Sequence, residues 1–236
     1  SERLGYVAHR AGHQARQAFE VMAANGFHVW LTDAAAPTPV ISYSVVTQGA
    51  AGGINITASH NPPWDCGFKV RDEHGAAVAP DGLREIEARI PTIDQVKRAA
   101  LEEAQAEKQI QAWDPAPAYI EHIGQLVEIE PIKEAGLHIL VEPMWGNGSG
   151  WFPRILEGGK TRVTEIHCER RPLFPEMIRP EPIPPNVDLA LQKTVDLGAD
   201  ACLMMDGDAD RMGVGDENGL FINQLQVYGL LAYYLL

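Results

Sequence analysis

Two short polar segments of this 236-residue chain carry the side chains best suited to chemistry. The first holds Ser59 and His60, with Lys69 ten positions after the serine. The second alternates three aspartates and ends in arginine, Asp206-Gly207-Asp208-Ala209-Asp210-Arg211. Each segment follows a predicted strand, which ends with the alternating Ile54 and Ile56 in the first case and with the apolar run 201–205 in the second. We therefore expect both sets of side chains on loops at strand ends, where a strand fixes their position and a loop gives access.

The alternating aspartates predict a cation site, because three carboxylates can converge on one ion when the loop curls. Carboxylate oxygens suit Mg²⁺ or Ca²⁺ rather than zinc or copper. A solvated acidic turn is the simplest alternative, but it explains less well why Asp206, Asp208 and Asp210 follow five apolar residues. A three-carboxylate Mg²⁺ loop is the interpretation we favour.

Two other functional interpretations of this loop remain open. An EF-hand calcium loop would place its last ligand at Glu217, but its sixth position should be glycine and is Arg211, and the flanks read as strands. A phosphatase of the haloacid dehalogenase type would use Asp206 as its nucleophile, but Asp210 stands where that motif has threonine. Both fit the sequence less well than a plain Mg²⁺ loop.

Ser59 by itself would be interpreted as a turn residue or a helix cap. Its neighbours favour a reactive hydroxyl, since His60 adjoins it, Lys69 follows, and Pro62 and Pro63 stiffen the turn. A phosphorylated serine facing an aspartate-bound Mg²⁺ is an arrangement that could transfer a phosphoryl group. The metal would neutralise phosphoryl oxygens, and a lysine could move the proton of an attacking hydroxyl.

Composition narrows the class of protein. The chain is 45% hydrophobic and 22% charged, as expected for a globular protein, and its formal net charge of −13 disfavours nucleic acid and anionic membranes as partners. The sequence shows neither an apolar run long enough to cross a bilayer nor a signal-peptide pattern. Three widely spaced cysteines indicate a reducing compartment. We expect a cytoplasmic protein with a small-molecule substrate.

The order of predicted elements indicates an α/β fold. In the first half, strands at 4–8, 27–31 and just before Ser59 alternate with helices at 14–25 and 40–48. A hairpin turn at 72–75, a helix at 82–90 capped by Asp81, and a solvated helix or connector over 91–112 follow. A helix at 116–128 is expected to bridge two domains.

The second half repeats the pattern. We predict strands at 138–141, 161–167, 201–205, 212–214 and 221–222, a turn at 146–150, an extended proline-rich loop at 172–185, a helix at 187–197 capped by Asn186, and an apolar helix at 225–236. The predicted fold class is α/β, with two consecutive three-layer α/β/α domains built on mixed, mainly parallel sheets.

The two chemical segments together resemble the α-D-phosphohexomutases of the phosphoglucomutase/phosphomannomutase type. The resemblance rests on Thr57-Ala58-Ser59-His60-Asn61-Pro62 and on the aspartate loop, in this order, with support from Pro37-Thr38-Pro39, Gly53-Ile54 and Gly67-Phe68-Lys69. It implies a fragment of a four-domain protein. Residues 1–113 would be the first domain with a truncated N-terminus, 114–222 the second, and 223–236 the start of the third.

The resemblance also implies roles for individual residues. Ser59 would be the phosphoserine and a metal ligand together with Asp206, Asp208 and Asp210. Lys69 would transfer protons and His60 would help to stabilise the transferring group. Arg211 and Arg10 would contact phosphate or substrate.

The implied reaction interconverts hexose 1-phosphate and hexose 6-phosphate through a bisphosphorylated sugar, with Mg²⁺ as cofactor and hexose 1,6-bisphosphate as activator. The residues at Pro62-Pro63 and Phe68-Lys69 resemble those of family members that act on glucose or mannose phosphates, which favours these substrates. Phosphoglucosamine mutase is the alternative, and so is a truncated non-catalytic module that binds metal or phosphosugar. Since the implied sugar-recognition loops lie outside these residues, we expect the isolated fragment to be inactive.

Overall fold

The computed structural model describes residues 3–8, 12–90, 95–107, 109–169, 171 and 173–236. The chain divides into two compact units, Ser1–Thr57 with Cys66–Tyr119, and Ala58–Asp65 with Ile120–Leu236. The segment that carries Ser59 therefore belongs to the second unit, although it lies in sequence between two strands of the first. Within the described residues, every helix is too short or too polar to span a lipid bilayer.

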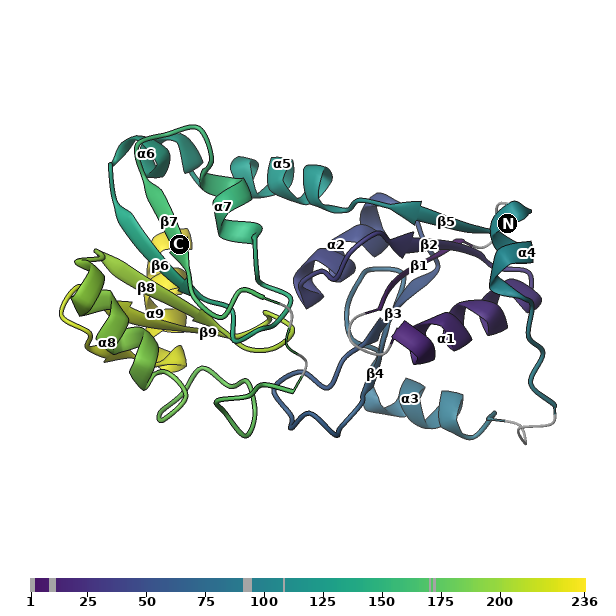
Figure 1. The fold of residues 1–236 in the computed structure, drawn as a ribbon. Helices are drawn as coiled ribbons and strands as arrows, with labels where there is room; N and C mark the ends of the chain where they lie inside the picture. Colours follow the sequence, from purple (N-terminus) through teal and green to yellow (C-terminus); the bar gives the residue numbers. More distant parts are fainter. Residues whose placement is uncertain (1–2, 9–11, 91–94, 108, 170, 172) are drawn as a thin grey trace. The chain divides into compact units, whose positions relative to one another are not determined.

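The first unit is built on a five-stranded sheet in the order β4-β3-β1-β2-β5 (Figure 1). β1 runs parallel to β2 and β3, and β2 runs parallel to β5, whereas β4 is antiparallel to β3. Its elements are β1 (Arg3–Ala8), α1 (Gly12–Ala24), β2 (His28–Thr32), α2 (Thr38–Thr47), β3 (Gly52–Ile56), β4 (Phe68–Arg71), α3 (Pro80–Glu87), α4 (Leu101–Ala106), β5 (Ile110–Trp113) and the start of α5 (Ala116–Leu126).

Apolar spacing explains how the helices cover this sheet. The α1 residues Ala15, Phe19 and Ala23 recur every four positions and are buried against strand residues such as Val29 and Ile54. α2 packs on β1 and β3. Its second residue is Pro39, which suits the first turn of a helix because the missing N–H would have no intrahelical partner there. The result is the predicted mixed α/β arrangement.

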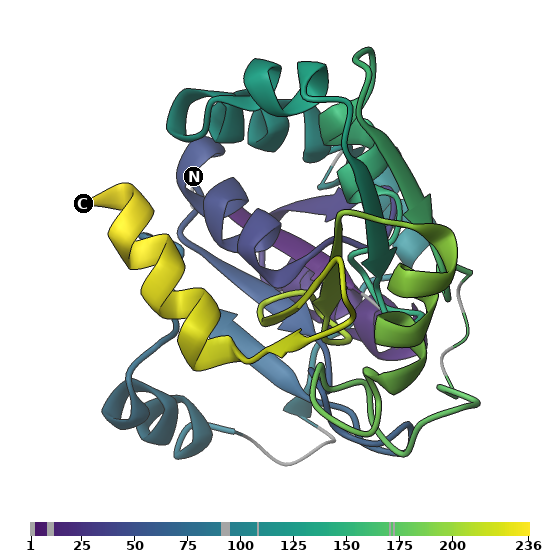
Figure 2. The ribbon, with the colours of Figure 1, turned by 90° about the vertical axis from the view of Figure 1, so that its left-hand side faces the viewer.

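The second unit repeats this plan with a sheet in the order β10-β9-β8-β6-β7. β6 is parallel to β7 and β8, and the β8-β9-β10 side is antiparallel. Figure 2 shows α8 and α9 on different sides of this sheet. Its elements are the end of α5, α6 (Ile129–Glu134), β6 (His138–Glu142), α7 (Trp151–Leu156), β7 (Arg162–Glu165), α8 (Asp188–Leu197), β8 (Ala201–Met205), β9 (Met212–Asp216), β10 (Phe221–Ile222) and α9 (Gln224–Leu235).

The core of the second unit follows the period of its strands. Leu140, Cys202 and Met204 lie on the face of the sheet that packs against α8. Val141 and Met205 lie on the opposite face and pack with Phe152 of α7. β6 is buried along its whole length and β8 is buried or half-buried, which explains the apolar residues 139–141 and 201–205.

Three sequence predictions about local structure were wrong. The described part of 91–112 contains the helix α4, which agrees with the predicted helix or connector, but it also contains most of the edge strand β5, which was not predicted. α3 begins after Ala79 rather than after a cap at Asp81. α8 has Val187 at its N-cap, because the Asn186 side chain instead donates hydrogen bonds to two backbone carbonyls of the preceding loop.

Candidate active site

The aspartate loop joins β8 to β9 within the second unit and gathers its three carboxylates. Asp206 and Asp208 are fully buried, and one ligand oxygen from each of Asp206, Asp208 and Asp210 lies within 4.8 Å of the others. The Asp206 Oδ1 atom accepts hydrogen bonds of 3.0 Å from the backbone N–H groups of Asp210 and Arg211. These bonds curl the loop around the first carboxylate, as the alternating sequence requires.

Burial and mutual repulsion make the cluster electrostatically costly. Burial first, and then the charges of Asp208 and Asp210, raise the pKa of Asp206 to about 7. A hard divalent cation would offset this repulsion, so the donor set fits Mg²⁺. The flanking elements are strands, which is incompatible with the helix-loop-helix of an EF-hand.

The serine loop brings its hydroxyl to these carboxylates. Ser59 Oγ lies 3.0 Å from Asp208 Oδ1 and 3.3 Å from Asp206 Oδ2, so its single proton can be donated to either. Ser59 has a φ of +53°, an uncommon left-handed conformation for a residue other than glycine. At a site of this kind such a conformation is consistent with a position fixed for function.

Close backbone approach requires glycine in the aspartate loop. A Cβ added to Gly207 would lie 2.6 Å from the Ser59 carbonyl oxygen and 2.9 Å from Cγ of Pro180. A Cβ on Gly146 would lie 2.5 Å from the Gly207 carbonyl oxygen. The Asn147 backbone N–H donates to that same oxygen at 3.0 Å. The 146–150 turn thus packs against the backbone of the aspartate loop at Gly207 and supports it.

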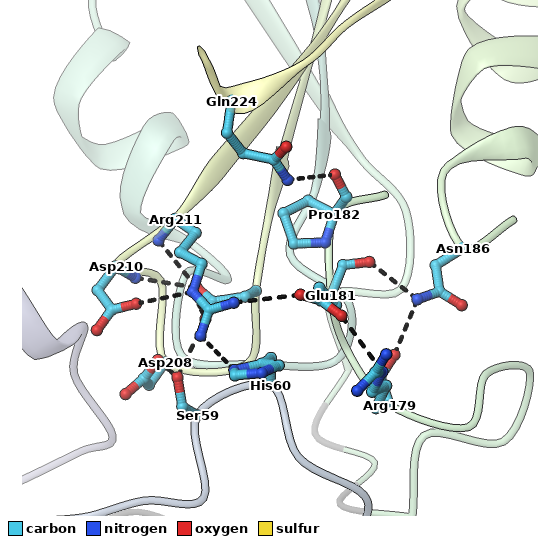
Figure 3. A network of polar contacts seen from close by, with 11 residues as sticks. Ser59, His60, Arg179, Glu181, Pro182, Asn186, Asp208, Asp210, Arg211 and Gln224 are labelled. Atoms are coloured by element: carbon cyan, nitrogen blue, oxygen red, sulfur yellow. Dashed lines mark hydrogen bonds and ion pairs between the residues drawn. The ribbon is translucent and has the colours of Figure 1, made fainter. Parts of the chain in front are cut away.

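Arg211 links the aspartate loop to His60 (Figure 3). Its Nη2 group donates to His60 Nδ1, so the proton of the neutral ring is on Nε2. Burial first, and then the Arg211 charge, lower the pKa of His60, which favours that neutral form. The Nη1 group of Arg211 also donates to Glu181 Oε1 at 3.2 Å.

The second unit therefore brings together six of the predicted site residues: Ser59, His60, Asp206, Asp208, Asp210 and Arg211. Lys69 belongs to the first unit, on β4 opposite Asn55 of β3. Arg10 lies outside the described residues.

Sequence reasoning missed Glu181 and a buried pair behind the aspartate loop. His167 Nδ1 and Glu142 Oε2 are 2.6 Å apart, and Glu142 Oε1 accepts from the backbone N–H of Met144 at 2.7 Å. The Trp145 ring stacks on His167 with centroids 4.0 Å apart. Met144 and Trp145 both have positive φ, and the pair holds this turn ahead of Gly146 through the Glu142 bond to Met144 and the His167 contacts with Trp145. A glutamate at the end of an apolar strand was the one available signal.

Comparison with known proteins agrees with this geometry. Residues 8–97 match the family model of phosphoglucomutase/phosphomannomutase alpha/beta/alpha domain I, and residues 117–219 match that of domain II. A protein named "Probable phosphoglucosamine mutase" from Pyrococcus abyssi is 34% identical over 201 residues, which are 85% of this chain and 42% of that protein. One named "Phosphoglucomutase/phosphomannomutase" from Thermococcus kodakarensis is 32% identical over 197 residues, 84% of this chain and 42% of that protein.

A solved structure supports the same assignment. A candidate phosphomannomutase from Thermus thermophilus superposes with a TM-score of 0.87 at 32% identity, and the match covers 98% of this chain and 52% of that one. These matches and the paired α/β/α units define a phosphosugar mutase fold. The chain belongs to the α-D-phosphohexomutase family. It spans about 42% of the length of the curated relatives named above.

Proposed function

We propose that this chain is the part of a phosphohexomutase that carries the phosphoserine and the metal site. The observation that supports this most directly is the contact of the Ser59 hydroxyl with the buried carboxylates of Asp206 and Asp208. A hydroxyl oxygen this close to both carboxylates lies within reach of a cation that they bind. The proposed metal ligands are a Ser59 oxygen and the three aspartates.

The proposed chemistry is phosphoryl exchange at Ser59 Oγ. The bond between phosphorus and Ser59 Oγ breaks while a bond to a sugar hydroxyl oxygen forms, and the proton of that hydroxyl passes to the amine of Lys69. The bisphosphorylated sugar then returns its other phosphoryl group to Ser59, and the proton returns to the leaving sugar oxygen. When bound, Mg²⁺ supplies positive charge that offsets the charge of the phosphoryl oxygens.

His60 and Arg211 would assist this exchange through their donors. The hydrogen bond from Arg211 leaves the Nε2 proton of His60 as a donor for a phosphoryl oxygen. Arg211 keeps a fixed positive charge beside the serine, and Arg10 would contribute another from the first unit. Stabilisation by such preorganised donors is the main protein contribution in phosphoryl transfer.

The proposed substrates are glucose and mannose phosphates. Relatives of similar identity carry names that cover glucosamine, glucose and mannose phosphates, so glucosamine phosphate is the alternative. We further propose the domain segments 1–113, 114–222 and 223–236, with hexose 1,6-bisphosphate as activator and a cytoplasmic location. Because the relatives are more than twice as long as their match to this chain, we propose that the isolated chain binds metal and phosphosugar with little turnover.

The test is a mutase assay with glucose, mannose and glucosamine 1-phosphates, each with Mg²⁺ and the matching bisphosphate. It compares the 236-residue chain with the whole protein that contains it. In the whole protein, Ser59→Ala should abolish interconversion, whereas Ser42→Ala on α2 should leave it intact. Turnover by Ser59→Ala at the wild-type rate would refute the phosphoserine. A phosphatase of the haloacid dehalogenase type would instead lose phosphate release on Asp206→Asn and keep it on Ser59→Ala.

A further inference from the structure

Glu181 lies between two arginines in the proline-rich loop of the second unit (Figure 3). Its Oε1 atom is 3.2 Å from Nη1 of Arg211, and its Oε2 atom is 3.2 Å from Nε of Arg179. The Arg211 side chain is 35% exposed, whereas that of Arg179 is 51% exposed. The contact with Arg211 is therefore the more shielded of the two and the stronger electrostatically.

The backbone around Glu181 is held from several sides. Asn186 Nδ2 donates to the carbonyl oxygens of Arg179 and Glu181 at 3.0 and 2.9 Å. Gln224 Nε2, at the start of α9, donates to the Pro182 carbonyl oxygen at 2.9 Å. These bonds set the position of the carboxylate before any ligand binds.

Arg211 has a choice of carboxylates. Its Nε atom lies 3.8 Å from Asp206 Oδ2 and 3.9 Å from Asp210 Oδ1, both longer than its 3.2 Å contact with Glu181. An arginine one residue beyond a metal-binding carboxylate competes with the cation for the same oxygens, because a guanidinium pairs readily with carboxylates. Glu181 offers it another partner.

We propose that Glu181 is a positioning residue that holds the Arg211 guanidinium on His60 and off the Asp206 and Asp210 oxygens, which keeps those oxygens available to a divalent cation. This inference rests on the metal site of the proposed function. It adds that a carboxylate outside the ligand set controls cation affinity through an arginine. Loss of the Glu181 charge lets Arg211 pair with the aspartates and oppose the metal.

The test is Mg²⁺ affinity of the 236-residue chain, measured by calorimetry, with Mn²⁺ binding followed by electron paramagnetic resonance. Glu181→Gln keeps the shape of the side chain and should weaken binding about fivefold or more. Glu176→Gln, which removes a more exposed charge that pairs with His167, is the matched control and should leave the affinity within about twofold.

A double-mutant cycle separates positioning from long-range charge. In an Arg211→Gln background, Glu181→Gln should have no further effect on Mg²⁺ affinity, since the competing guanidinium is gone. An equal loss in both backgrounds would overturn the inference and assign the effect to charge alone. Unchanged affinity of Glu181→Gln in the wild-type background would also overturn it. A wild-type chain that binds no Mg²⁺ would overturn the metal site itself, and with it the proposed function.

A spectroscopic readout tests the second half of the proposal without metal. The ring nitrogens of His60, observed by ¹⁵N NMR, should show Nδ1 as the acceptor and Nε2 as the protonated atom in the wild type. Glu181→Gln should change the tautomer ratio or the Nδ1 shift, because Arg211 leaves the ring. Identical His60 signals in the two proteins would contradict the positioning role.

Discussion

Replacing Asp206 by asparagine should stabilise the metal-free protein while it destroys the metal site. Asp206 is fully buried, and burial together with two neighbouring carboxylates raises its pKa to about 7 from an ordinary 3.8. Asparagine is nearly isosteric, and its Oδ1 can still accept from the backbone N–H groups of Asp210 and Arg211. The substitution thus removes a buried charge and keeps the hydrogen bonds that shape the loop.

The size of the effect follows from linkage between proton binding and folding. Because the folded-state pKa of Asp206 is raised, its contribution to stability is fully present below the unfolded pKa and is lost as the pH rises through the folded one. Between about pH 5 and about pH 8 that loss amounts to about 2 to 3 kcal/mol. Asp206→Asn does not titrate, so its advantage over the wild type should grow by this amount over the same interval.

The assay is urea unfolding of the metal-free chain and of Asp206→Asn across this pH range. Mg²⁺ at about a hundred times its dissociation constant should restore about 2.7 kcal/mol to the wild type and nothing to the variant. An advantage of Asp206→Asn that does not change with pH would refute the argument that burial raises the pKa of this carboxyl. Equal Mg²⁺ stabilisation of both proteins would refute Asp206 as a ligand.

Three further substitutions test other parts of the structure. Gly207→Ala should cost about 1 to 3 kcal/mol in urea unfolding and slow phosphoryl exchange at Ser59, since the new methyl group would meet the serine backbone. Gly75→Ala should cost about 2 kcal/mol or more, because Gly75 has a φ of +75° and its Cβ would lie 2.1 Å from a backbone oxygen of α2. His167→Gln should remove part of the pH dependence of the free energy of unfolding. The hydrogen bond to Glu142 raises the pKa of His167. The stabilisation is therefore fully present below the ordinary histidine pKa and is lost as the pH rises through the raised value.

Matched controls accompany these changes. Gly124→Ala in α5 and Gly229→Ala in α9 place a methyl group where no atom beyond the local helix backbone lies within 4 Å, so they should not destabilise the chain. His28→Gln removes an exposed histidine outside this pair and should change the stability by no more than about 0.5 kcal/mol. A destabilisation by either control glycine as large as that of Gly207→Ala or Gly75→Ala would contradict the steric argument. A pH dependence of His167→Gln equal to that of the wild type would contradict the assigned pair.

The fold class could be predicted because it depends on local patterns. Alternating helices and strands gave the three-layer plan and the mixed sheets, which the family models and the structure confirm. The strand β5 was missed because only Ile110 is fully buried while Gln111 and Ala112 are exposed, so its four residues lack a clear pattern. Its pairing with β2 joins segments that are distant in sequence, which no local signal reports.

The candidate site was predictable to different degrees. Ser59 and Asp208 are 149 positions apart, and residue chemistry alone could say only that a phosphoserine and a metal loop would suit each other. Glu181 gave no signal, since it sits in a proline-rich loop without periodicity and its role depends on where the Arg211 side chain reaches. His167 itself gave no signal, because its partner Glu142 lies 25 positions away.

The most direct test of the central claim is mass spectrometry of the phosphorylation state of Ser59 in protein purified from its native source. Intact mass followed by fragmentation should show about one phosphate per chain, located on Ser59, and Ser59→Ala should lack it. A labelled phosphate on Ser59 should pass to the sugar when the protein is mixed with unlabelled hexose 1-phosphate and Mg²⁺, and Asp208→Asn should slow this exchange. An active protein in which Ser59 carries no phosphate at any stage would contradict the account.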